Sequence, residues 1–415
     1  MSEPHDRRAT VTGIGVVAPN GTSTDTFWKA TKEGLSVLDR VTREGCEHLP
    51  LKVAGEVRAF DPAATIEERF LVQTDRFTHF AMAAADFALE DARLGPADTS
   101  EDPYSIGVVT AAGSGGGAFG QRELQQLWGK GSRFVGPYQS IAWFYAASTG
   151  QVSIRRKFKG PCSVVASDEA GGLDALAHAA RAVRRGTDVI VAGSTEAPLA
   201  PYSMVCQLGY GELSREEEPT RAYRPFTDAA CGFVPAEGGA MLVVEAERSA
   251  RERGADVRAF VAGHAATFTG ASRWADSREG LAHAVRQALE EAGCAPEEID
   301  VVFADALGVP EADRAEALAL ADALGAHGTR VPVTAPKTGI GRGYCAAPVL
   351  DTAAAVLAME QGLIPPTPNV FDVCHDLDLV TGRARVAELR TALVLSRGLM
   401  GSNSALVLRR GAVNA

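Results

Sequence analysis

Short, nearly continuous runs of apolar residues recur along this chain and alternate with segments of helical periodicity. Such runs, closed by Gly, Pro and Asn, are typical of strands that are buried on both faces. Strands are predicted at residues 9–18, 105–110, 188–193, 238–245, 257–263, 301–304, 331–334, 391–395 and 404–408.

Between the strands, apolar residues recur every three or four positions. Residues 69–92 show this best, with Phe77, Phe80, Ala84 and Phe87 on one helical face. Helices are predicted at residues 27–35, 69–92, 121–128, 280–293 and 346–359. Strands that alternate with helices indicate sheets covered on both faces, and therefore an α/β fold.

The second part of the chain repeats the plan of the first. The segments that correspond are 9–18 with 257–263, 105–110 with 301–304, and 162–176 with 331–350. This pairing predicts an internal duplication, with the charged stretch 249–256 as the boundary. We therefore expect two halves, residues 1–255 and 256–415, packed side by side as an α-β-α-β-α body.

The stretch CSVVASDEAGGLDAL, residues 162–176, predicts a strand that turns sharply into a helix. Such an elbow lifts the residue at its apex into a site, and many enzymes place a nucleophile there. Here the apex is Glu169, a carboxylate at a helix N-terminus, where the free N–H groups favour negative charge.

Composition excludes several classes of function. The 415 residues are 46% hydrophobic and 22% charged, with a net charge of -11, which argues against nucleic acid and anionic membrane as partners. No apolar run reaches the roughly 18 residues of a membrane span. Residues 1–10 are polar and predict no signal peptide.

The seven cysteines lack CxxC spacing, and the eight histidines show no paired spacing. The cysteines are interpreted as small buried apolar residues in a reducing cytoplasm. We expect no metal site and no cofactor.

Residues 134–145 are unusually aromatic, with two interpretations left open: core packing, or contact with a partner protein. A basic group has two interpretations as well: a solvated charged face, which we favour, or contact with an acidic partner protein. Its members are Arg122, Arg155, Arg156, Lys157 and Lys159.

Seven segments of the chain have specific local sequences. They are VTGIGVVAPNG at 11–21, GQRELQQLW at 120–128, AWFYAASTGQVSIR at 142–155, EAGGLDAL at 169–176, RPFTDAACGFVPAEGGAMLVVE at 224–245, VFADALGVPEADRAEA at 302–317 and VTAPKTG at 333–339. Through these segments, in this order, the chain resembles the thiolase-fold condensing enzymes, and most of all the chain-length factor, or ketosynthase β subunit, of bacterial type II aromatic polyketide synthases. The resemblance runs from about residue 11 to residue 410.

The resemblance implies where a catalytic set would lie. A working ketosynthase carries a Cys at the elbow and two His; the matched positions here are Glu169, Asp305 and Arg342, and only Lys337 is retained. A carboxylate cannot replace a thiolate nucleophile, and the proton transfer that imidazole provides near neutral pH is lost. We therefore expect no condensation by this chain alone.

The chain also departs from the resembled subfamily, which mostly carries Gln at the elbow. An ionised Glu169 would repel malonate, which argues against a role in priming decarboxylation. We expect instead that Glu169 caps its helix and pairs with Arg342, and that Asp305 and Arg342 form a buried polar network.

Gly117, Gly120 and Leu124 have the spacing of one helical face. The resemblance implies that bulky residues at these positions close a channel shared with a ketosynthase partner, so two glycines imply an open channel and a long product. The alternative is a flexible entry to a helix with no contact to a ligand.

Three hypotheses follow. In the first and preferred one, the chain is a non-condensing subunit that pairs with a ketosynthase α subunit and sets the length of a chain carried by acyl carrier protein. In the second, the chain condenses alone with another nucleophile. In the third, Glu169 supports decarboxylation of malonyl groups.

Overall fold

In the computed structural model, which describes residues 8–95, 102–270 and 274–411, eleven strands form one mixed sheet in the order β12-β10-β9-β14-β15-β8-β1-β7-β6-β4-β5. The strands of the first half are β1 (Ala9–Val17), β4 (Ile106–Ala111), β5 (Cys162–Val165), β6 (Val189–Glu196) and β7 (Gly238–Ala246). The strands of the second half are β8 (Ala259–Phe268), β9 (Val301–Phe303), β10 (Pro332–Thr334), β12 (Asp378–Leu379), β14 (Thr391–Arg397) and β15 (Ser402–Arg410).

The predicted duplication is visible in the strand order. Outward from the centre, one half runs β1-β7-β6-β4-β5 and the other β8-β15-β14-β9-β10. The halves join where β1 pairs with β8, antiparallel, at Thr10–Phe260 and Val11–Ala259. The division after residue 255 stays a prediction, as does the absence of a signal peptide, because residues 1–7 lie outside the described part.

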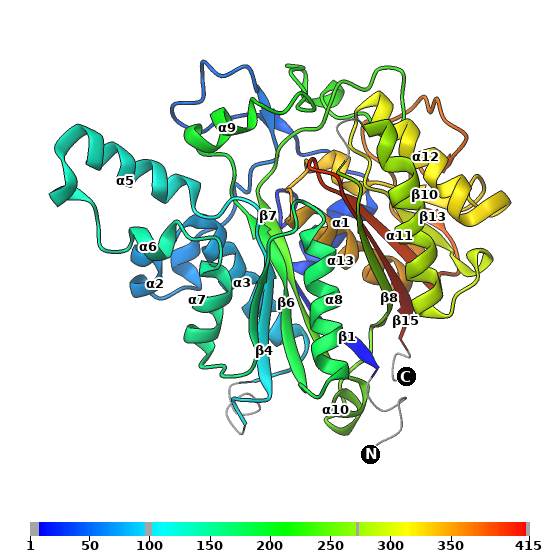
Figure 1. Ribbon diagram of the computed structural model, residues 1–415, viewed down its shortest axis with the longest axis horizontal. Helices are drawn as coiled ribbons and strands as arrows, with labels where there is room; N and C mark the ends of the chain where they lie inside the picture. The colour runs from blue at the N-terminus through cyan, green and yellow to red at the C-terminus, as the bar shows by residue number, and fades with distance from the viewer. Residues whose placement is uncertain (1–7, 96–101, 271–273, 412–415) are drawn as a thin grey trace.

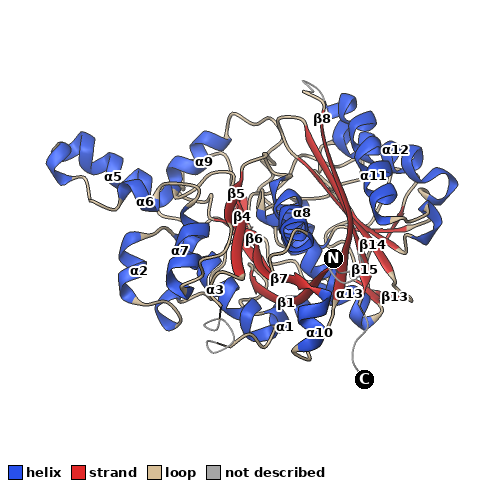
Figure 2. Ribbon diagram, turned by 60° about the horizontal axis from the view of Figure 1, so that its bottom comes forward, coloured by secondary structure: helices blue, strands red, loops and turns tan. Residues whose placement is uncertain are grey.

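The two halves of the sheet form two layers, with helices outside each half and between them (Figures 1 and 2). This arrangement confirms the α-β-α-β-α fold. One outer layer is α3 (Arg76–Asp91) and α7 (Ala147–Arg156), the central layer is α8 (Gly171–Arg184) and α13 (Ala346–Gln361), and the other outer layer is α11 (Ser277–Ala292) and α12 (Pro310–Leu324). The central α13 packs against strands of both halves and is buried on nearly every side, which explains why its sequence is apolar all round.

The helix predicted over residues 69–92 is two helices, α2 (Glu68–Gln73) and α3, so this prediction was wrong. The chain is extended at Thr74, and Asp75 caps α3 by accepting a bond from the Phe77 N–H. The same carboxylate accepts from the Phe119 N–H at 2.7 Å, across a gap of 44 residues. The periodicity of apolar residues cannot predict a contact between residues this far apart in the sequence.

The helix predicted at residues 121–128 is longer, α5 (Gly117–Lys130), and begins inside the glycine run. Together with α6 (Gln139–Ala142) it projects from the body, and we call residues 117–145 the arm (Figure 1). The remaining elements are short: α1 (Thr24–Lys32), β2 (Asp39–Arg40), β3 (Val53–Ala54), α9 (Pro201–Gln207), α10 (Glu247–Glu252), β11 (Leu363–Ile364) and β13 (Arg385–Val386).

Candidate functional site

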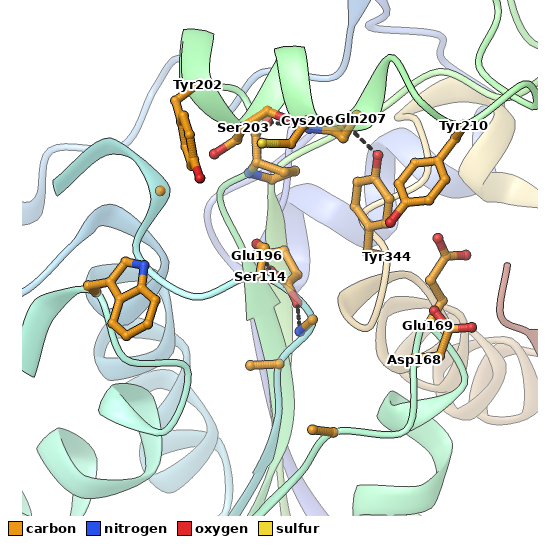
Figure 3. Close-up of a pocket in the computed structure, with 16 residues that line it drawn as sticks. Ser114, Asp168, Glu169, Glu196, Tyr202, Ser203, Cys206, Gln207, Tyr210 and Tyr344 are labelled. Atoms are coloured by element: carbon orange, nitrogen blue, oxygen red, sulfur yellow. Dashed lines mark hydrogen bonds between the residues drawn. The ribbon is translucent and has the colours of Figure 1, made fainter. Parts of the chain in front are cut away.

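The predicted elbow is present between β5 and α8. The left-handed backbone conformation is at Asp168, with φ 56°, one residue before the predicted apex. Asp is among the residues that tolerate this conformation, and its carboxylate accepts a bond from the Met400 N–H at 2.7 Å. Glu169 follows, 3% exposed, with its side chain directed away from α8 (Figure 3).

Glu169 does not cap the helix, so that expectation was wrong: α8 begins after Ala170, without a capping side chain. Instead, Oε2 of Glu169 accepts from Nε and Nη2 of Arg342, at 3.0 and 2.8 Å. The predicted pairing with Arg342 is therefore confirmed. The other oxygen, Oε1, is buried and has no hydrogen-bond partner among the residues that the structure describes.

Arg342 uses all of its N–H groups. Nη1 donates to Oδ1 and to the carbonyl oxygen of Asp305, at 2.7 and 3.1 Å, and Nη2 also donates to the Arg397 carbonyl at 2.6 Å. Asp305 accepts in addition from Nε of Arg397 at 3.0 Å. The predicted polar network of Asp305 and Arg342 is confirmed, and Arg397 is a member that the sequence analysis missed.

The network continues away from the elbow. Nη2 of Arg397 donates to Oε2 of Glu316 at 2.9 Å. Lys337 donates from Nζ to the Ala304 carbonyl at 2.8 Å and forms an ion pair with Asp351 at 2.5 Å. Every buried cation here thus faces a carboxylate or a carbonyl, as buried charges require.

Burial and neighbouring charges shift the pKa values of the two acids of the network in opposite directions. Burial raises the pKa of Glu169 to about 7, although Arg342 acts in the opposite direction. Burial also acts on Asp305, but Arg342, Arg397 and Lys337 outweigh it and lower the pKa of Asp305 to about 2. Asp305 is thus the ionised partner of both arginines, whereas Glu169 titrates near neutral pH.

Where a thiol and two imidazoles would act, the chain has two acids held by a guanidinium. Cys345 contacts the elbow, with Sγ donating to the Asp168 carbonyl at 2.9 Å. Burial raises the pKa of the Cys345 thiol well above its usual value, which makes it a poor nucleophile.

The cysteines are not all buried, so that interpretation was wrong for four of them. The exposed ones are Cys162, Cys206, Cys231 and Cys374. Cys162 is exposed because β5 is the edge strand of the sheet, and Cys206 is exposed because it lies on α9, which borders a cavity.

A cavity of about 380 Å³ lies between the elbow and the start of the arm (Figure 3). Its lining residues are Ala112, Gly113, Ser114, Gly117, Trp143, Ala166, Asp168, Glu169, Glu196, Pro198, Tyr202, Ser203, Cys206, Gln207, Tyr210 and Tyr344. The carboxyl group of Glu169 points toward the rings of Tyr210 and Tyr344 (Figure 3). The cavity therefore joins the elbow to Gly117, which the sequence placed in separate motifs.

Glu196 is a second buried acid on the cavity wall that the sequence analysis missed. Its carboxylate accepts from the Gly113 N–H at 2.5 Å and from the Ser114 hydroxyl at 2.9 Å (Figure 3). Burial raises the pKa of Glu196 to about 7. Its position three residues after the predicted strand 188–193 was the only available signal.

The three predicted channel residues lie on one side of α5 but differ in surroundings. Gly117 borders the cavity, Gly120 is buried, and Leu124 is 37% exposed and outside the cavity lining. A Cβ atom on Gly120 would lie 2.8 Å from Cδ1 of Trp143. Their role in chain length stays a prediction.

The aromatic residues of the arm are at the surface, so the core interpretation was wrong for this chain. The exposed ones are Phe134, Tyr138, Trp143, Phe144 and Tyr145, and α5 adds Trp128. A cluster of this kind, rich in aromatic side chains, is typical of a protein interface.

The basic group is not a uniformly solvated face. Arg155 is held by Glu67 at 2.6 Å and by Asp86 at 2.5 Å, and Arg156 is also paired with Asp86. The favoured interpretation was therefore wrong for these two residues. Contact of the other basic residues with a carrier protein stays a prediction.

Among the residues that the structure describes, no three His, Cys, Asp or Glu side chains converge as metal ligands. Within the same residues, no helix has both the length and the apolar composition needed to cross a bilayer.

Comparison with known proteins identifies the family. The chain matches the beta-ketoacyl synthase N-terminal domain over residues 6–250 and the C-terminal domain over residues 258–371. The chain belongs to the beta-ketoacyl synthase family. Within this family it is a ketosynthase β subunit, or chain-length factor, of the type II polyketide synthase group.

Two curated relatives and two solved structures of the family support this placement. The chain is 79% identical to a protein of Streptomyces coelicolor named as a polyketide beta-ketoacyl synthase 2, over 98% of this chain and 96% of the relative. It is 51% identical to the tetracenomycin polyketide synthase ketoacyl synthase beta subunit of Streptomyces glaucescens, over 96% and 98% of the two chains.

The ishigamide ketosynthase/chain length factor superposes with a TM-score of 0.89 at 28% identity, covering 98% of this chain and 99% of that one. A type II ketosynthase in complex with its acyl-carrier protein, bound to the hexaketide, superposes with a TM-score of 0.87 at 29% identity and the same coverage.

Proposed function

We propose that this chain is the non-condensing, chain-length-determining subunit of a type II polyketide synthase. It pairs with a Cys-containing ketosynthase α subunit, and the pair builds and measures a poly-β-ketoacyl chain on an acyl carrier protein. The pathway makes an aromatic polyketide, an antibiotic or pigment, in the cytoplasm. The names of the relatives and of the superposed structures support this proposal.

The observation that carries the non-condensing role is the position of Arg342. Its guanidinium lies between Glu169 and Asp305, bonded to both, at the centre where a thiolate and imidazoles would have to meet. A fully bonded, buried guanidinium cannot act as a base or a nucleophile at neutral pH. The scaffold therefore supports binding, and condensation is left to the partner.

Two features of the surface support the pairing. Within the described part of the chain, strand β5 pairs with β4 alone, so its other edge presents unpaired backbone groups. Exposed edges of this kind are covered in native assemblies. The aromatic cluster of the arm provides the apolar contact that such an assembly needs.

The cavity supports the measuring role. Gly117, which has no side chain, borders the cavity at one end, and Glu169 at the elbow borders it at the other. A growing chain that enters from the partner therefore has room on the arm side of the cavity, and we propose a long product.

The test is reconstitution of the chain with its ketosynthase and carrier protein. The proposal predicts no condensation without the partner, and a shorter product from the Gly117→Phe pair. The added Cβ would lie 2.0 Å from the hydroxyl oxygen of Ser203 and 3.4 Å from its Cβ, so this hydroxyl has to rotate away.

The matched control is Gly129→Phe on the same helix, where an added Cβ meets nothing within 4 Å. This variant should leave product length unchanged. Condensation by the isolated chain, or an unchanged product from the Gly117→Phe pair, contradicts the proposal.

One observation favours a second candidate, decarboxylation of malonyl groups that primes synthesis. With its pKa raised to about 7, Glu169 carries a proton in a large share of molecules at neutral pH, and the neutral form does not repel malonate. Its carboxyl group points toward the cavity (Figure 3), and Oε1 has no hydrogen-bond partner among the described residues. Carbon dioxide release by the pair should then fall in Glu169→Ala, and unchanged release removes this candidate.

A further inference from the structure

The glycine run at the root of the arm makes room for another segment of the chain. The Gly116 N–H donates to the Trp143 carbonyl at 3.1 Å. A Cβ on Gly116 would lie 2.0 Å from the Ala142 carbonyl oxygen, and one on Gly115 would lie 2.6 Å from the Trp143 carbonyl oxygen. The run is therefore packed against residues 142–143.

The same segment fills the space beside Gly120. The indole Cδ1 of Trp143 is 2.8 Å from the position of a Cβ on Gly120, and Cγ and Nε1 are both 3.7 Å from it. Any side chain at residue 120 would have to displace this ring. The ring thus occupies the volume that a larger side chain at residue 120 would take. It comes from a different segment of the chain, just after α6.

Trp143 also belongs to the cavity wall, together with Gly117 and Glu169. It is 53% exposed, so one part of the ring packs on Gly120 and another is free to meet a ligand. Glycine at residue 120, taken alone, would imply free space beside α5, but the ring of Trp143 fills that space.

We propose that Trp143 is a specificity-determining residue of this cavity, which acts as a gate for the poly-β-ketoacyl chain in place of a side chain at residue 120. The proposal rests on the chain-length function stated above. Gly117 and Trp143 then set the free length together: Gly117 contributes no side chain to the cavity wall, and the indole ring limits how far the chain extends along α5.

The first test is product length in the reconstituted pair. Trp143→Ala should raise the ratio of longer to shorter products roughly tenfold or more, the discrimination that one or two carbon atoms give in an apolar pocket. Trp143→Phe should give a smaller rise. In the double variant Trp143→Ala with Gly120→Leu, the new side chain takes the vacated volume and the original length should return.

The second test does not depend on synthesis. Cys206 lines the same cavity and is exposed, so the rate at which a bulky maleimide alkylates it reports the opening. Trp143→Ala should raise that rate severalfold, and Gly120→Leu should reverse the rise. Cys374, exposed and outside the cavity lining, is the control whose rate should not change.

The outcomes separate the two proposals. If Gly117→Phe shortens the product while a folded Trp143→Ala pair gives the original product and the original Cys206 rate, the gate is overturned and the chain-length function stands. If Cys206 becomes more reactive but neither variant changes the product, the gate geometry stands and the chain-length function is overturned.

Discussion

Arg342 binds one oxygen of Glu169 twice and leaves the other without a partner. Nε and Nη2 lie 3.0 and 2.8 Å from Oε2, while Oε1 is buried beside the cavity. An arginine facing a carboxylate head-on would engage both oxygens. The side-on arrangement arises because the rest of the guanidinium is committed to Asp305 and to the Arg397 carbonyl.

The first prediction concerns the stability that Arg342 supplies. Arg342→Met retains most of the apolar stem but leaves Glu169 buried without a cation. Removing one partner of a buried pair destabilises by about 3 kcal/mol or more, because the other charge is left uncompensated. Urea unfolding of the purified complex with the ketosynthase measures the loss in the free energy of unfolding.

The control is Arg390→Met, since Arg390 and its partner Glu388 are 75% and 70% exposed. The free energy of unfolding should change there by less than about 1 kcal/mol. A second substitution, Glu169→Gln, should recover part of the loss in Arg342→Met. Equal effects at the two arginines would mean that the buried network adds no stability.

The second prediction is the pH dependence of Glu169. Its pKa is raised from the usual 4.5 to about 7, so the folded chain holds a proton that the unfolded chain has released. The stabilisation is present at low pH and is lost as the pH rises through about 7. Glu169→Gln, which cannot ionise, should gain about 1 to 3 kcal/mol on wild type between about pH 5 and about pH 8.

Thermal or urea unfolding of both proteins across this range measures the difference. For Glu388→Gln, at an exposed position, the free energy of unfolding should vary with pH as it does for wild type. Because Glu196 also titrates near pH 7, both proteins keep a residual slope, and only the difference between them reports Glu169. A difference that shrinks as the pH rises contradicts the assignment.

The third prediction places the partner on the arm. Trp128 on α5 is 82% exposed, an unusual state for the largest apolar side chain. If the ketosynthase covers it, Trp128→Glu should weaken the pair by about 2 kcal/mol or more, as at other interfacial tryptophans. Phe371, 78% exposed in the second half of the chain, is the control. Dissociation constants of the two variant pairs decide the matter, and equal constants exclude the arm.

The fourth prediction uses the cysteines as a footprint. In the isolated chain, iodoacetamide should modify Cys162 on the edge strand, and burial should protect Cys345. In the pair, Cys162 should become protected while Cys231 and Cys374 stay reactive. Mass spectrometry of peptides from both samples gives the result. Continued reaction of Cys162 in the pair would show that β5 is not the covered edge.

Apolar periodicity was enough to predict most of the fold. Near-continuous runs identified the long strands, because strands covered by helices on both faces have no polar side to expose, although the long central strands pair antiparallel. The method failed at Thr74, where a helix breaks without Gly or Pro because the Asp75 cap also binds the Phe119 N–H. It also missed the first turn of α5, which begins at Gly117, four residues before the predicted start, although glycine disfavours helix.

The sequence by itself determined what is absent from the catalytic centre, since Glu169, Asp305 and Arg342 occupy matched positions whatever their contacts. Only the tertiary structure decided how these residues combine. Glu169 and Arg342 are 173 residues apart, and which oxygen is bound depends on the other bonds of the guanidinium. Trp143 likewise takes the space beside Gly120 through packing between two elements. Local patterns report burial along one element, whereas partners, pKa values and cavity walls arise where distant elements meet.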